Sequence, residues 1–210
     1  MNNKIKADSI IFDLDGTLWN SIEGLTVAWD SYGRRFGFPG VFTQERMSAI
    51  MGFTGIEVED YFRPMLGSRT EEVIAICLAE ADAQLTKEGV KFYPQIEETL
   101  DNLSRRKPLF LVSNCKTGYL EAFLEMSGCR RYFTDWACEG STDLPKAENI
   151  VRMVKLHGLQ SAVYVGDTIK DENSSRKAGV QFIHAAYGFG SAAAPDAVIK
   201  RLADLPGIIE

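Results

Sequence analysis

Short apolar runs that alternate with helical patterns constrain the fold of this chain most strongly. Four of these runs are rich in residues that favour β-strands: Ser9–Phe12, Leu109–Ser113, Ala162–Gly166 and Gln181–Ala185. A weaker fifth run lies at 135–138. Short apolar runs of this kind are typical of parallel strands that are buried on both faces. We therefore expect these segments to form the strands of one sheet.

The segments between the runs carry apolar residues at helical spacing. In the segment 94–104, for example, Ile96, Leu100 and Leu103 fall on one helix face. Glycines suited to a helix end follow three later patterns: Gly128, Gly158 and Gly179. Strands that alternate with helices of this length predict an α/β fold, in which a parallel sheet has helices on both faces.

One long stretch, 21–89, breaks this alternation. It contains helical patterns and no convincing strand. An apolar stripe in steps of three and four residues runs from Ile22 to Phe36, and another helix begins near Thr70 and can end at Gly89. The sequence therefore predicts an all-helical domain at 19–89, inserted into an α/β core domain that comprises 1–18 and 90–210.

Polar residues gather where the predicted strands end. Ligands of open parallel sheets bind at the carboxyl ends of the strands, so the side chains found there are candidates for a functional site. Seven residues reach that edge in the predicted topology: Asp13 and Asp15 after the first strand, Ser113 and Asn114 after the second, Lys146 at the start of a later helix, and Asp167 with Asp171 after the strand Ala162–Gly166.

The chemistry of this set points to a phosphoryl group and a metal ion. Converging carboxylates repel each other unless a cation lies between them, and Mg²⁺ prefers such hard oxygen ligands. A lysine and the hydrogen-bond donors of Ser113 and the backbone near Asn114 would suit phosphoryl oxygens. Each residue alone has a structural explanation, such as a turn, a helix start or a solvated surface. Their combination at one sheet edge favours function.

The segment Asp13-Leu14-Asp15-Gly16-Thr17-Leu18 resembles the first motif of the haloacid dehalogenase (HAD) superfamily of hydrolases. Three further segments resemble its second, third and fourth motifs, in the same order: Ser113, Lys146, and Gly166-Asp167-Thr168 with Asp171. The helical insertion resembles the cap of the phosphoglycolate phosphatase and β-phosphoglucomutase branch. Around Lys146 the sequence Leu-Pro-Lys-Ala departs from the commoner Lys-Pro form. The resemblance implies a Rossmann-like core with a helical cap.

The resemblance also implies a reaction and a cofactor. It implies a Mg²⁺-dependent phosphatase that hydrolyses a small phosphorylated metabolite through an aspartyl-phosphate. In that reaction Asp13 is the nucleophile and Asp15 is the acid and base. The Mg²⁺ ligands would be Asp13, the backbone carbonyl of Asp15, and Asp167.

The remaining residues of the set would bind phosphate or support the site. The resemblance assigns Ser113 and Lys146 to catalysis by holding the phosphoryl group, with Asn114 beside them. It assigns Asp171 the supporting role of positioning Lys146 or a metal-bound water.

Two other functions are compatible with the same residues. A phosphomutase-type phosphotransferase, like β-phosphoglucomutase, would return the phosphoryl group to a sugar. A non-enzymatic phosphate-sensing module would also place an aspartate and a lysine at parallel strand ends. Such modules are shorter and have neither the helical insertion nor an acid two residues after the nucleophile.

Charge and composition exclude several partners and compartments. The net charge is −6 and no run of Lys and Arg stands out, which argues against nucleic acid. No apolar stretch approaches the length of a membrane span or a signal peptide, so we expect no membrane association. The four cysteines have no C-x-x-C spacing, and we expect a reduced, cytoplasmic protein. We further expect a monomer or a weak homodimer.

Overall fold

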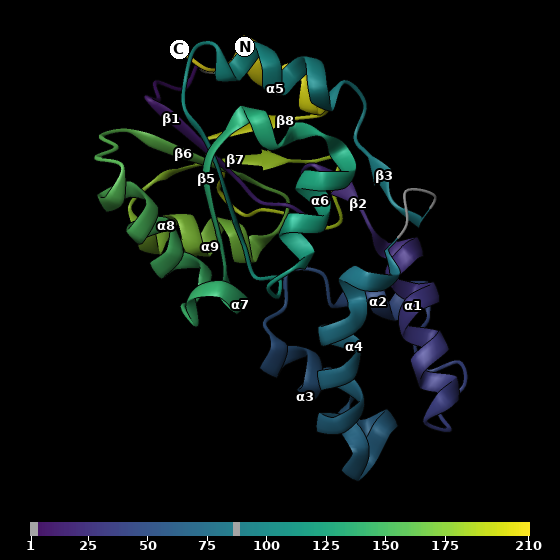
Figure 1. Ribbon diagram of the computed structural model, residues 1–210. Coiled ribbons are helices and arrows are strands. Elements are labelled where there is room, and N and C mark those ends of the chain that lie inside the picture. Colours follow the sequence, from purple (N-terminus) through teal and green to yellow (C-terminus); the bar gives the residue numbers. More distant parts are fainter. Residues whose placement is uncertain (1–3, 86–88) are drawn as a thin grey trace. The chain divides into compact units, whose positions relative to one another are not determined.

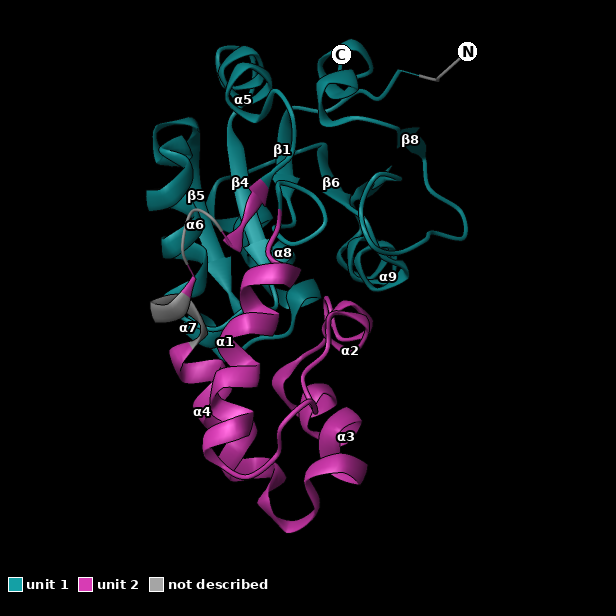
Figure 2. Ribbon diagram, turned by 90° about the vertical axis from the view of Figure 1, so that its right-hand side faces the viewer, with its two compact units in different colours: residues 1–19, 92–210 teal, residues 20–91 magenta. Residues whose placement is uncertain are grey.

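The computed structural model describes residues 4–85 and 89–210. The chain divides into two compact units, one made of Met1–Trp19 with Phe92–Glu210 and the other of Asn20–Lys91 (Figure 2). The first is an α/β unit and the second is helical. Their assignment as catalytic core and cap stays a prediction.

A six-stranded sheet forms the centre of the α/β unit, with the strand order β5-β4-β1-β6-β7-β8. Every neighbouring pair of these strands is parallel. The bounds of the strands are β1 (Ser9–Phe12), β4 (Leu109–Ser113), β5 (Phe133–Cys138), β6 (Ala162–Gly166), β7 (Gln181–Ala185) and β8 (Ala197–Ile199). The predicted α/β fold is thus confirmed (Figure 1). The strand β8 was not predicted, and β5 begins before position 135.

Four helices connect these strands: α5 (Ile96–Ser104), α6 (Tyr119–Ser127), α8 (Lys146–Leu156) and α9 (Ile169–Ala178). Because parallel crossovers are right-handed, α5 and α6 cover one face of the sheet, and α8 and α9 cover the other (Figure 1). The chain moves outward from β1 in one direction and later returns in the other. The resulting switch point lies at β1, and ligands of such sheets bind there, at the carboxyl ends of the strands.

The remaining elements of the α/β unit are short: α7 (Glu139–Thr142), η3 (Cys129–Tyr132) and η4 (Leu202–Gly207). The helix predicted over 94–104 begins two residues late, at Ile96, because Gln95 has a left-handed φ of 62°. The core against α8 consists of alternate strand residues such as Ile11, Phe110 and Tyr164, all fully buried with Ile150 of the helix. Alternation of this kind fixes which side chains emerge at the sheet edge.

The helical unit contains α1 (Ile22–Arg35), α2 (Gln44–Ala49), α3 (Gly55–Leu66), η1 (Gly67–Arg69) and α4 (Thr70–Gln84). Within its described residues no strand occurs between 21 and 89, as the sequence predicts. Its core is aromatic: the ring of Phe42 contacts Trp29 and Phe62 edge to face, with centroids 5.4 and 4.9 Å apart. The structure thus provides this unit with a hydrophobic core of its own.

The chain passes between the units at two very short strands, β2 (Trp19–Asn20) and β3 (Lys91–Phe92), which form a two-stranded sheet. Neither strand was predicted, since two residues are too few for a periodic pattern. Across the described residues, no helix is both long and apolar enough to span a membrane.

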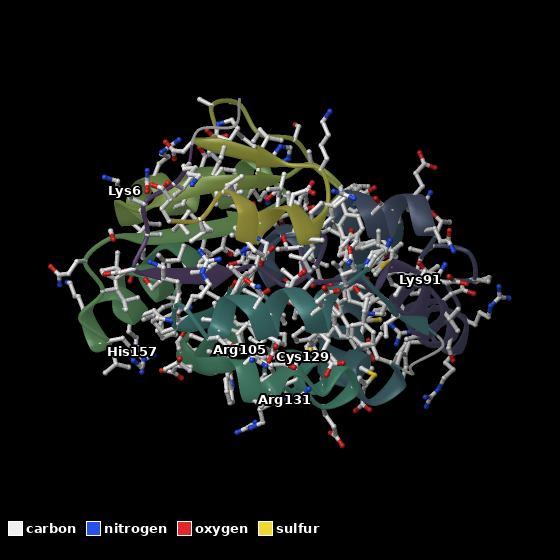
Figure 3. The ribbon with its side chains drawn as sticks, turned by 90° about the horizontal axis from the view of Figure 1, so that it is seen from above. Lys6, Lys91, Arg105, Cys129, Arg131 and His157 are labelled. Carbon is white, nitrogen blue, oxygen red and sulfur yellow. The ribbon has the colours of Figure 1, made fainter. Side chains whose placement is uncertain are left out.

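Charged side chains on the surface of the α/β unit form simple ion pairs. Arg131 reaches outward (Figure 3) and pairs with Glu97, and Arg105 pairs with Asp101 one helical turn away, at 2.8 Å. Exposed pairs of this kind contribute little to stability. The buried ion pairs described next are of a different kind, because water does not screen them.

Candidate active site

Asp13 and Lys146 form a buried ion pair at the carboxyl end of β1. Asp13 follows the strand directly, and its N–H donates to the carbonyl of Val165 at 2.8 Å, which continues the pairing with β6. Lys146 is the first residue of α8, and its Nζ lies 2.9 Å from Asp13 Oδ1. Both side chains are at most 4% exposed. The structure therefore places the lysine directly beside the predicted nucleophile.

Asp171 holds the other side of the same ammonium group. Its Oδ1 lies 2.6 Å from Lys146 Nζ, and its Oδ2 accepts hydrogen bonds from the N–H and the hydroxyl of Thr168, at 3.0 and 2.7 Å. Thr168 in turn caps α9 by accepting from the Asp171 N–H. This reciprocal capping box fixes the aspartate. Both carboxylate oxygens of Asp171 are thus already engaged.

Asp167 lies in a space that two glycines leave open. A Cβ on Gly16 would come within 2.1 Å of Asp167 Oδ2, and one on Gly188 within 2.3 Å of Asp167 Cβ. Gly16 also has a φ of +75°, which glycine adopts without strain. Oδ2 accepts from the N–H of Phe189 at 2.7 Å. Oδ1 is buried and has no hydrogen-bond partner among the described residues. A buried carboxylate oxygen without a partner is costly unless a cation or water binds it.

The charges of this cluster do not balance. Oxygens of Asp13, Asp167 and Asp171 lie within 4.8 Å of one another. The ammonium of Lys146 forms ion pairs with two of these carboxylates, Asp13 and Asp171. Burial, reinforced by the carboxylate of Asp171, raises the pKa of Asp13 to about 8 even though Lys146 opposes the shift. Burial and Asp171 likewise raise the pKa of Asp167 to about 7. Burial also disfavours the ammonium, but Asp13 and Asp171 outweigh it and hold the pKa of Lys146 well above its usual value.

The cluster therefore fits a divalent cation. Its donors are hard carboxylate oxygens, and one of them, Asp167 Oδ1, is buried without a partner. Asp13 and Asp167 carry the raised pKa values, and a cation would stabilise their ionised forms. Asp171 completes the acidic group but is held by Lys146 and Thr168. Because both oxygens of Asp171 already have partners, Asp13 and Asp167 are favoured over Asp171 as ligands of the cation.

Asp15 has different partners, although it lies two residues from Asp13. Its side chain is half-buried, and its Oδ1 accepts hydrogen bonds from the indole Nε1 of Trp19 at 2.9 Å and from the hydroxyl of Tyr119 at 2.8 Å. Neither donor was predicted to belong to the site. Trp19 was predicted only as the first residue of the helical insertion, and nothing was predicted for Tyr119.

Ser113 and Asn114 leave the sheet at the same edge. β4 is paired with β1 in a register that sets Phe12 opposite Leu111, so the residues after each strand emerge together. Ser113 is buried, and its hydroxyl accepts a hydrogen bond from the N–H of Cys115 at 3.4 Å. This hydrogen bond turns the loop that follows β4 back toward Ser113, the last residue of the strand.

The haloacid dehalogenase-like hydrolase family matches residues 10–185 of this chain. The chain belongs to this family. The match spans every residue of the acidic cluster, from Asp13 to Asp171.

Similar proteins point to one enzyme class. A phosphoglycolate phosphatase from Pseudomonas aeruginosa is 29% identical, over 93% of this chain and 77% of that protein. One from Vibrio vulnificus is 28% identical over 95% of each. A solved haloacid dehalogenase-like hydrolase from Streptococcus pneumoniae has a TM-score of 0.84 at 25% identity, over 96% of this chain and 97% of that one. These similarities confirm the predicted family and the predicted class, a HAD-like phosphatase.

The raised pKa values predict how a metal ion should change thermal stability. The folded-state pKa values of about 8 for Asp13 and about 7 for Asp167 lie above the ordinary aspartate pKa of 3.8, so both residues keep their protons as the unfolded chain loses them. Their contribution to stability is therefore complete below about pH 4 and is lost as the pH rises to about 8. A divalent cation replaces these protons, so its stabilising effect should grow over the same interval.

This expectation can be measured as the rise in Tm on adding MgCl₂ at fixed pH. The rise should be larger at about pH 8 than at about pH 6, and Asp167→Asn should reduce it strongly at both. Comparing Tm with and without metal at each pH removes the effect of other titrating groups. A metal-induced rise that is independent of pH, or that survives in Asp167→Asn, would contradict the assignment.

Proposed function

We propose that this protein is a Mg²⁺-dependent phosphatase that hydrolyses a small phosphorylated metabolite through an aspartyl-phosphate on Asp13. The observation that carries the proposal is the buried cluster in which Lys146 bridges Asp13 and Asp171 beside Asp167. In this proposal Asp13, Asp167 and the backbone carbonyl of Asp15 hold the metal ion. Bound there, the ion would polarise the phosphoryl oxygens and offset their charge.

In the first proposed step, a carboxylate oxygen of Asp13 attacks phosphorus. A bond forms between that oxygen and phosphorus while the bond to the leaving oxygen breaks, and Asp15 gives its proton to the leaving oxygen. Lys146 suits this step because its ammonium already lies 2.9 Å from Asp13 Oδ1. It can offset negative charge as the phosphoryl group arrives.

In the second proposed step, water hydrolyses the aspartyl-phosphate. Asp15 is now ionised and takes a proton from the water. The water oxygen bonds to phosphorus, and the bond between phosphorus and Asp13 breaks. The products are inorganic phosphate and the original carboxylate. One residue can serve both steps because the first leaves it in the protonation state that the second needs.

The proposed phosphate site consists of Ser113, Asn114 and Lys146, with Asp171 as the residue that positions the lysine. The hydrogen bonds from Thr168 to Asp171 support this last role, because they fix the carboxylate that holds Nζ. The Leu-Pro-Lys-Ala departure from the family pattern leaves Lys146 at the start of its helix, after Pro145.

The substrate class rests on the relatives. Those from Pseudomonas aeruginosa and Vibrio vulnificus are named phosphoglycolate phosphatases, which favours a small, anionic phosphomonoester. We further propose that Asn20–Lys91 acts as the cap that selects this substrate. A cytoplasmic protein that works as a monomer or weak homodimer is consistent with a small soluble substrate.

A phosphate-release screen tests the proposal. Purified protein should be incubated with a panel of phosphomonoesters, including phosphoglycolate and β-glucose 1-phosphate, with MgCl₂ or with EDTA. We expect Mg²⁺-dependent release of phosphate from a few small anionic substrates. Conversion of β-glucose 1-phosphate to its isomer without phosphate release would indicate the phosphomutase instead. Binding of phosphate analogues without turnover of any substrate would indicate a sensing module.

A further inference from the structure

The carboxylate of Asp15 is held by two hydrogen-bond donors from separate parts of the α/β unit. The Tyr119 hydroxyl comes from the first turn of α6, and the Trp19 indole from β2. Both donate to the same oxygen, Oδ1, at 2.8 and 2.9 Å. Two donors that converge on one oxygen restrict rotation of the carboxyl group, because rotation would lengthen both bonds.

The two donors are themselves fixed by packing. Trp19 is fully buried and Tyr119 is 7% exposed. Their rings meet edge to face with centroids 5.3 Å apart, and the indole contacts Phe123 of the same helix at the same distance. The indole also stacks with Phe92, with ring centroids 6.2 Å apart. Aromatic side chains packed in this way have few alternative rotamers, so the positions of their polar atoms are set by the core.

We propose that Tyr119 and Trp19 are positioning residues that hold the Asp15 carboxyl in the orientation required for proton transfer. The inference rests on the proposed function, in which Asp15 protonates the leaving oxygen. Proton transfer requires the carboxyl group within hydrogen-bond reach of that oxygen, and small misplacements cost rate. Neither aromatic residue needs to contact the substrate for this role, since each acts through Asp15.

A purely structural role for the same residues makes a different prediction. Loss of packing or folding would lower the reaction of every substrate to a similar degree. Loss of positioning would affect only substrates whose leaving group needs a proton. An alkoxide is a poor leaving group and needs one, whereas 2,4-dinitrophenolate departs without one. The ratio of the two reactions therefore isolates the positioning effect.

The experiment measures kcat/KM, which reports the steps up to departure of the leaving group, for an alkyl phosphate and for 2,4-dinitrophenyl phosphate. The alkyl substrate is the best one found in the phosphate-release screen. In Tyr119→Phe, which removes only the hydroxyl, we expect kcat/KM to fall about tenfold for the alkyl phosphate. For the aryl phosphate we expect a change of less than about twofold. Trp19→Phe should give the same pattern.

Two reference variants complete the design. Asp15→Asn should show the same substrate dependence in stronger form. Tyr187→Phe is the matched control, because its hydroxyl also donates a 2.8 Å hydrogen bond, to the Thr17 carbonyl, and does not bond to Asp15. We expect it to change both substrates by the same factor. Combining Tyr119→Phe with Trp19→Phe should cost less than the product of the single effects, since both act on one oxygen.

The outcomes separate this inference from the proposed function. Equal losses on both substrates in Tyr119→Phe, or no loss on the alkyl phosphate, would overturn the positioning role. An increase on the alkyl phosphate would also overturn it, because it would mean that the donors restrain Asp15 away from the substrate. If the wild-type protein hydrolyses neither substrate with Mg²⁺, the proposed function fails instead. Hydrolysis of the aryl phosphate by each variant shows that its active site is folded.

Discussion

Replacing Asp13 with asparagine should lower kcat by at least about a thousandfold. The amide has nearly the same shape as the carboxylate, but it cannot attack phosphorus, so no aspartyl-phosphate can form. The variant should remain folded, because the substitution removes one of the three carboxylates that crowd the buried cluster. The measurement is phosphate release at saturating Mg²⁺ with the best substrate of the screen, together with Tm.

Asp60→Asn is the control for this substitution. Asp60 lies on α3 and pairs on the surface with Arg63 at 3.5 Å, so its loss should leave kcat unchanged. Trapping experiments should also detect phosphorylated protein in the wild type and in Asp60→Asn, but not in Asp13→Asn. Turnover by Asp13→Asn within about tenfold of wild type, with normal Mg²⁺ binding, would rule out the nucleophile assignment.

Replacing Lys146 with methionine should damage both activity and stability. Methionine keeps most of the side-chain volume but removes the charge that bridges Asp13 and Asp171. We expect kcat to fall by about a hundredfold or more, because the phosphoryl group loses a fixed cationic partner. Without Mg²⁺, the free energy of unfolding should fall by about 3–5 kcal/mol, the usual cost of leaving buried charge unpaired.

The matched control lies on the same helix. Lys155 is exposed in the last turn of α8, and Lys155→Met should change neither kcat nor unfolding beyond small surface effects. Denaturant unfolding in EDTA measures stability, and added Mg²⁺ should restore part of the loss in Lys146→Met by neutralising the same carboxylates. Equal behaviour of the two lysine variants would refute the central place of Lys146.

The sequence predicted the fold correctly where a local pattern of residues identifies an element without knowledge of its neighbours in space. The strands β1, β4, β6 and β7 were predictable because each is a short apolar run bounded by polar residues. Their parallel order then brings Asp13, Lys146 and the aspartates after β6 to one edge. The proximity of Lys146 to Asp13 followed from topology, although the two residues are 133 positions apart.

Other features of the fold and of the site leave no recognisable pattern in a single sequence. The strand β8 has three residues and gains its identity from pairing with β7. The hydrogen bond to Asp167 from Phe189 uses a backbone N–H, which any residue but proline supplies. Tyr119 lies on a helix whose apolar residues resemble ordinary core positions. Its hydrogen bond to Asp15 becomes visible only in the folded structure, where α6 lies beside the loop after β1.

The cluster around Asp13 has a consequence for how this protein acquires activity during synthesis. Its members come from the start and the last third of the chain, and the backbone donor to Asp167 follows β7. A polypeptide that ends before Phe189 lacks at least one of these groups. Contacts between such distant segments form late, because closing long loops is entropically unfavourable. Catalytic competence should thus arise as one of the final events of folding.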